Sequence, residues 1–149
     1  MNSTGSGVLS DAFLDQRMQG KNMFKLGKVT ESFDFLEEML DQARKRVAKG
    51  SESALFEVME SLIVLARLRM EVGQFTKVDW CLTETRSILT SNNESLKRLS
   101  EDRVLFLWGK YYHLQGKNFW RELYHQRSYE VFNEGIDFLK KYNSPNERL

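Results

Sequence analysis

The sequence has 149 residues, a length that predicts one domain with a core large enough to fold without disulfides or metals. Its 22 basic and 21 acidic side chains nearly cancel, so a nucleic-acid partner is not expected. The single cysteine, Cys81, excludes an internal disulfide and a cysteine-based zinc site. The only proline is Pro145, so nothing earlier in the chain forbids long helices.

No segment of the sequence predicts export or a membrane span. The first residues lack the basic and apolar regions of a signal peptide. Apolar runs such as residues 62–66 are far too short to cross a bilayer. We therefore expect an intracellular protein, cytoplasmic or nuclear, without a membrane partner.

The first predicted helix covers residues 9–26, and Gly27 follows it as a C-terminal cap because glycine enters the left-handed region freely. The second predicted helix covers residues 30–48, with Thr30 as its N-cap, and Gly50 ends it. Its apolar residues recur three and four positions apart, which places them on one face. We expect this face to pack on its neighbours.

The third predicted helix begins at Ser51 or Ser53 and ends at Gly73. Apolar residues cover most of its circumference, which is typical of a helix buried on several sides. We expect it to be the central element. Thr76 is the predicted N-cap of the fourth helix.

The fifth predicted helix opens with the capping-box spacing of residues 91–94 and ends at Gly116. Asn118 is the predicted N-cap of the sixth helix. The expected inward-facing residues of that helix are Trp120, Tyr124, Ser128, Val131, Phe132, Ile136 and Leu139. No strand pattern is present, and the short connections make sequential helices antiparallel neighbours.

An internal repeat accompanies these helices. In each hairpin a small residue precedes the loop glycine by seven positions, and the pairs are Gly20 and Gly27, Ala66 and Gly73, and Gly109 and Gly116. With the apolar residues that follow each glycine, this pattern resembles the tetratricopeptide repeat. Residues 65–82 match best, residues 20–36 match moderately, and residues 108–116 match only in the first helix.

The resemblance implies an all-α fold of six antiparallel helices in three tetratricopeptide-like hairpins. The repeats lie 46 and then 43 residues apart, whereas the family repeats about every 34 residues and usually ends each repeat in proline. We expect one helical domain at 9–142, between a disordered N-terminus at 1–8 and a frayed tail at 143–149. An up-and-down helical bundle is the alternative fold.

Enzyme motifs are absent from the sequence. His113 and His125 lie on different predicted helices, and no known nucleophile, zinc or phosphate-loop motif occurs. Cys81 lies on an apolar helix face, where a buried structural thiol is expected. We therefore predict a non-catalytic protein with no cofactor and no metal site.

The resemblance implies that the first helix of each hairpin lines a groove, with the residue after the small position pointing into it. Here those residues are Lys21, Arg67 and Lys110, and all three are basic. The other predicted groove residues are Arg17, Phe24, Ile63, Met70, Arg103, Phe106 and His113. A groove of this kind suits an acidic, partly apolar peptide of a partner protein. The alternative is that common basic residues align by chance.

The last predicted helix is unusually aromatic, which indicates a second kind of function. One face needs fewer aromatic residues than are present, so we expect an interface there. Its predicted residues are Trp120, Tyr124, Tyr129, Phe138 and Tyr142. The alternative function is therefore a structural subunit that self-associates, as a homo-oligomer, or docks through its terminal helices in a larger helical assembly.

Overall fold

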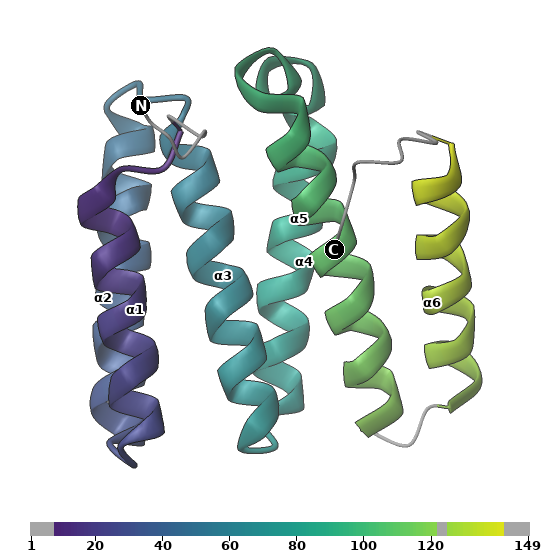
Figure 1. Ribbon diagram of the computed structural model, residues 1–149, viewed down its shortest axis with the longest axis horizontal. Helices are drawn as coiled ribbons and strands as arrows, with labels where there is room; N and C mark the ends of the chain where they lie inside the picture. Colours follow the sequence, from purple (N-terminus) through teal and green to yellow (C-terminus); the bar gives the residue numbers. More distant parts are fainter. Residues whose placement is uncertain (1–7, 122–124, 142–149) are drawn as a thin grey trace.

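The computed structural model describes residues 8–121 and 125–141, without the side chains of residues 125, 126 and 128, and it confirms the all-α class (Figure 1). Six helices follow one another, and the described residues contain no strand. They are α1 (Asp11–Lys25), α2 (Val29–Ala48), α3 (Ala54–Glu71), α4 (Phe75–Ser91), α5 (Asn93–Arg121) and α6 (His125–Lys140). The predictions for residues 1–7, Tyr124, the side chain of Ser128 and residues 142–149 fall outside this description.

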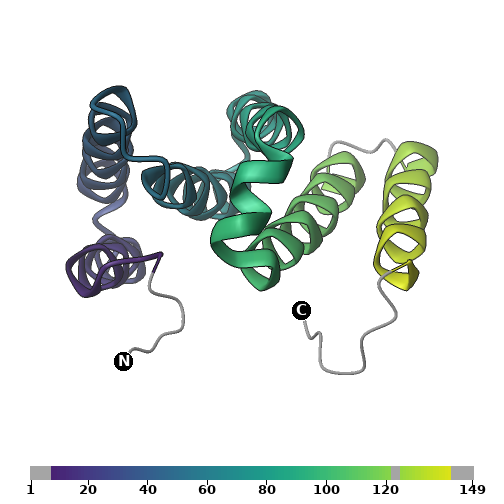
Figure 2. The same ribbon diagram turned by 90° about the horizontal axis from the view of Figure 1, so that it is seen from above.

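Each helix packs against the next one along the chain, and α3 also contacts α1 and α5. Seen from above, α2 and α4 lie on one side of the array and α1 and α5 toward the other, with α3 between them (Figure 2). The helices α1, α3 and α5 share one face of the molecule, where side chains of α1 and α5 both pair with a glutamate of α3. No described helix has the length and apolar content that a membrane span requires.

The core is centred on α3, as its apolar circumference predicted. Phe56, Met59 and Leu65 are fully buried, and the exposed charged side chains of this helix are Arg67 and Glu71. Burying a large apolar side chain stabilises a fold by roughly 1.5–3 kcal/mol. This helix therefore contributes much of the free energy that holds the array together.

Glycine turns end three of the helices, as predicted. Gly27, Gly50 and Gly73 have φ values of 84°, 101° and 79°, in the left-handed region that favours glycine. The predicted caps Thr30 and Thr76 are wrong, because α2 and α4 begin one residue earlier, at Val29 and Phe75. The residue after the glycine leads directly into the next helix, which leaves each threonine inside the first turn.

The predicted capping box at residues 91–94 is also wrong. Ser91 is the last residue of α4, and the Asn92 side chain donates to the Ile88 carbonyl instead of capping α5. A kink at Ser100, with φ −167° and ψ 101°, divides α5. The Ser100 hydroxyl accepts a hydrogen bond from the backbone N–H of Arg103 and so caps the longer part of the helix.

The predicted third turn at Gly116 does not exist. Helix α5 continues to Arg121, and a Cβ atom at Gly116 would lie 2.4 Å from the Phe132 ring of α6. This glycine therefore permits close helix packing instead of turning the chain. Asn118, the predicted cap, is buried inside α5 and donates from its side chain to the Phe75 carbonyl.

The inward face of α6 is only partly as predicted. Val131 is buried, but Ile136 is 51% exposed. Gly135 faces α5 in its place, and a Cβ there would lie 2.7 Å from the Cβ of Tyr112. Because neighbouring helix positions point about 100° apart, a face that includes Gly135 turns Ile136 to solvent.

Candidate functional site

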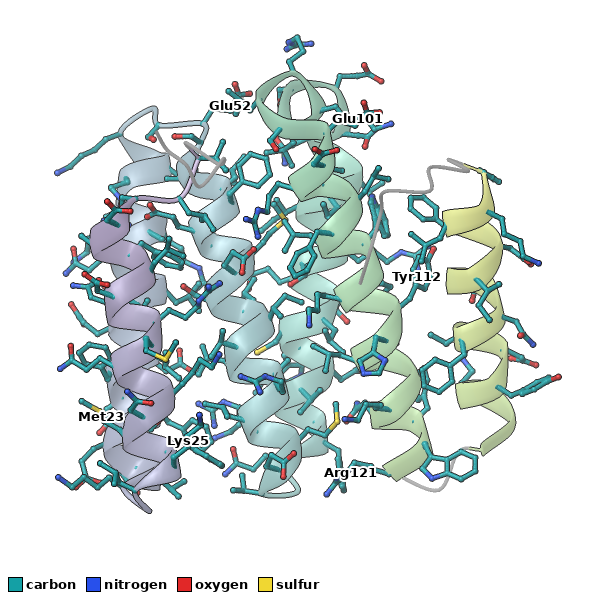
Figure 3. The ribbon with its side chains drawn as sticks, in the orientation of Figure 1. Met23, Lys25, Glu52, Glu101, Tyr112 and Arg121 are labelled. Atoms are coloured by element: carbon teal, nitrogen blue, oxygen red, sulfur yellow. The ribbon has the colours of Figure 1, made fainter. Side chains whose placement is uncertain are left out.

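Basic side chains from α1, α3 and α5 share one face of the array. We call it the basic face and define it by Arg17, Lys21, Lys25, Arg67, Arg103, Lys110 and Lys117, together with the carboxylate of Glu60. Within each helix these residues recur at steps of four or seven, which keeps them on one side. Figure 3 shows Lys25 and Arg121 near one end of the array, and Glu52 and Glu101 at the other.

Lys21 is the centre of the positive charge. Burial is the main cause that lowers its pKa, and the next causes are the charges of Arg67, Arg17, Lys25 and Lys110. Those cations come from three helices, so the array brings all of them within electrostatic reach of Lys21. In the part of the chain that the structure describes, neither Lys21 nor Arg67 has an ion-pair partner. The face is therefore a region of uncompensated positive potential that attracts anions.

Glu60 supplies the carboxylate of this face, and the sequence analysis did not predict it. Its side chain is only 3% exposed, and it lies 2.7 Å from Arg17 Nη1 and 2.9 Å from Arg103 Nη1. One carboxylate of α3 thereby joins a guanidinium from α1 to another from α5. Bonds between ionised partners are shorter and about twice as strong as neutral ones, so this contact holds the three helices in register.

The apolar part of the predicted groove is smaller than expected. Ile63 and Met70 are buried in the core, because α3 packs on neighbours around most of its circumference. Phe24 is half-buried, with its ring 6.0 Å from that of Phe33 in α2. Phe106 remains on the basic face, with Arg103 5.3 Å and Lys110 5.4 Å from its ring centre.

His113 is an exposed member of the same face. Partial burial is the largest cause that lowers its pKa, followed by the charges of Lys117 and Lys110. A lowered pKa keeps the imidazole neutral at pH 7, so it adds hydrogen-bonding capacity without further charge.

The residues of the predicted terminal interface differ in their exposure. Trp120 and Tyr129 are 56% and 65% exposed, whereas Phe138 packs with its ring 5.3 Å from Trp108. Tyr124 and Tyr142 lie outside the described residues. An exposed tryptophan of α4, Trp80, was not singled out by the sequence analysis.

The described residues contain no group of three histidine, cysteine, aspartate or glutamate side chains able to hold a metal ion. Cys81 is buried, as predicted, and burial raises its pKa to about 11. A thiol with so high a pKa is almost wholly protonated at neutral pH and is a poor nucleophile.

Comparisons with known proteins give no assignment, because no family model matches the sequence and neither a curated protein nor a solved structure matches it significantly. The resemblance to the tetratricopeptide repeat therefore stays a prediction from the sequence.

Proposed function

We propose that the protein is a non-catalytic interaction module whose basic face binds an acidic segment of another protein. The observation that carries this proposal is the charge around Lys21. Four further cations from α1, α3 and α5 act on it, although the whole chain has a net charge of only +1. Positive charge is therefore concentrated on one face, where it can select and orient an acidic partner.

The composition of the face favours a segment that is partly apolar. Phe106 offers aromatic surface beside Arg103 and Lys110, and both Phe106 and Phe24 are only half-buried. The near-neutral chain gives no general attraction for nucleic acid, whose binding depends on extended contact with phosphates. A short peptide can use both the charges and the aromatic rings of this one face.

Ion pairs behind the face support its rigidity. Arg69 of α3 pairs with Glu37 of α2 at 2.8 Å, and Arg46 of α2 pairs with Glu57 of α3. Rigid helices lose little conformational entropy on binding, so more of the interaction energy is available as affinity.

A triple charge reversal tests this function. The variant carries Lys21→Glu, Arg67→Glu and Lys110→Glu, and the probe is a short fluorescent peptide in which aspartate and glutamate alternate with leucine and phenylalanine. Three repulsive contacts cost several kcal/mol, so we expect affinity to fall by more than about 100-fold at constant ionic strength. Circular dichroism should show unchanged helicity.

Three charge reversals elsewhere form the matched control: Lys49→Glu, Lys77→Glu and Lys140→Glu, which lie after α2, in α4 and in α6. The control has the same net charge as the test variant and should keep at least half of the affinity. Equal losses in both variants would contradict a specific face. Displacement of the peptide by an equal concentration of a single-stranded oligonucleotide would point to nucleic acid instead.

Self-association through α6 is the second candidate function. This helix contacts only α5 among the described helices, and its exposed Tyr129 and Ile136 lie two turns apart on one side. If that side pairs two copies, light scattering should show a dimer that Tyr129→Glu with Ile136→Glu converts to a monomer. A wild-type protein that stays monomeric at every concentration would exclude this function.

A further inference from the structure

The contact between Glu60, Arg17 and Arg103 differs from the other ion pairs of the described chain. The pairs of Arg44 with Glu84, Arg46 with Glu57 and Arg69 with Glu37 match one guanidinium with one carboxylate. Glu60 instead serves two guanidinium groups, from α1 and α5. The cluster therefore keeps a surplus positive charge at the point where the three helices of the basic face meet.

Both arginines keep hydrogen-bonding capacity beyond Glu60. A guanidinium has five N–H donors, and each of these side chains uses its Nη1 for the bond to Glu60. Arg17 and Arg103 are about one-quarter exposed, whereas Glu60 is buried. The carboxylate is thus hidden behind two guanidinium groups that reach solvent, and an incoming anion would meet donors first.

Structural stability alone does not account for this arrangement. Burying a carboxylate is costly, and well-packed hydrophobic residues often hold helices together equally well. Moreover, the other cations around Lys21 repel a protonated lysine there and favour an anion nearby. A bound oxyanion would satisfy the free donors and compensate the surplus charge at once.

We propose that Glu60 positions Arg17 and Arg103 as a paired-guanidinium site for one oxyanion, a carboxylate or a phosphorylated side chain, on the segment that binds the basic face. The planar forks of two arginines match oxyanion geometry and bind it more specifically than lysine point charges do. Glu60 is a positioning residue here, since it acts through the two arginines. This inference rests on the proposed function and deepens it.

The effect of Glu60→Gln on binding should be opposite to the effect that net charge alone predicts. Glu60→Gln removes a negative charge from the basic face, so simple attraction would strengthen binding of an acidic peptide. If Glu60 positions the arginines, the same substitution weakens binding, by about tenfold when one charge-assisted contact is lost. Glu84→Gln is the matched control, because it removes the carboxylate partner of Arg44 on another part of the array.

A double variant protects the test against misfolding of Glu60→Gln. Arg17→Lys with Arg103→Lys keeps both charges and the pairing with Glu60 but removes the planar forks. We expect it to keep the helical circular dichroism spectrum and to lose about tenfold in affinity. If Glu60→Gln does not fold, this double variant decides the question.

The probes are acidic, partly apolar peptides that differ at one central position, which is aspartate, phosphoserine or asparagine. The wild-type protein and Glu84→Gln should prefer an anionic central residue by about tenfold, and both test variants should lose this preference. The ratio for phosphoserine and aspartate identifies the source of the oxyanion. Binding that Glu60→Gln strengthens, or a preference that the double lysine variant retains, would overturn the proposal.

The proposed function and the paired-guanidinium site can be refuted separately. If no acidic peptide binds the wild-type protein, the proposed function fails and this inference falls with it. If acidic peptides bind and the triple charge reversal abolishes binding, but the central residue has no effect, only the paired-guanidinium site is refuted.

Discussion

The contact of Gly116 with α6 gives a sharp test of the fold. A Cβ atom added at Gly116 would lie 2.4, 2.6 and 2.6 Å from three atoms of the Phe132 ring. Ordinary contacts of this kind are 3.4–4 Å long, so the ring or the whole of α6 must move by about 1 Å. Gly116→Ala should therefore loosen the packing of α5 on α6.

The expected magnitude follows from two opposing effects. Overpacking a closely packed site costs about 1–3 kcal/mol, and alanine in place of glycine favours a helix by about 1 kcal/mol. We expect a net loss of up to about 2 kcal/mol in the free energy of unfolding. For a chain of this length that lowers the melting temperature by up to about 8 °C.

A second substitution should restore part of that loss. Leucine lacks the Cε1 and Cζ ring atoms of Phe132 that the added methyl group would meet. Phe132→Leu should thus make room for the methyl group that Gly116→Ala adds, and the double variant should be more stable by about 1 kcal/mol than the sum of the two single effects. Urea denaturation followed by circular dichroism measures all three variants.

The refuting results are specific. Additive effects, or a Gly116→Ala variant more stable than the wild type, would show that the close contact with Phe132 does not exist. Asparagine distinguishes a packing glycine from a turn glycine, because it tolerates the left-handed region. Gly73→Asn should cost less than the roughly 1–2 kcal/mol expected for most other residues in the left-handed region, whereas Gly116→Asn should cost at least as much as Gly116→Ala.

Two further predictions follow from titrating groups. With a pKa of about 11 for Cys81, alkylation by iodoacetamide at pH 8 should be at least about 100-fold slower in the native protein than in urea, measured by mass spectrometry; equal rates would contradict its burial. The pKa of Lys21 is lowered, so its charge opposes folding at pH 7, and this penalty fades as pH rises through the folded pKa toward 10.5. Lys21→Gln should therefore raise the melting temperature, less so in high salt, while Lys49→Gln should not; an unchanged or lower value for Lys21→Gln would refute the repulsion.

The sequence predicts the helices and their turns where one local rule decides the outcome. Gly27, Gly50 and Gly73 end helices because the left-handed conformation is needed there. The apolar circumference of α3 predicts its central position for a similarly direct reason. The predicted N-caps Thr30 and Thr76 are wrong because each turn leads directly into the next helix, so that no side-chain cap forms.

The position of the turn in the third hairpin could not be predicted, because Gly116 satisfies two rules at once. A glycine seven positions after Gly109 looks like a third turn, yet tertiary packing against Phe132 gives it another use. The contact gives a better alignment of the third hairpin with the first, because Gly116 and Phe132 lie sixteen residues apart, as do Gly20 and Leu36. In that alignment the residue after the small position is Lys117, which is also basic and lies on the same helix as Lys110.

Glu60 shows what the sequence could have revealed about the site. Charged residues are almost never fully buried without a partner, and a helix that is apolar on nearly every side offers few exposed positions. Glu57, Glu60 and Arg69 of α3 must therefore have partners on neighbouring helices, which the sequence does not identify. The structure supplies them, as Arg46 for Glu57, Glu37 for Arg69, and both Arg17 and Arg103 for Glu60. Only the last of these carboxylates has two arginine partners, and that surplus of positive charge is why we propose the binding site there.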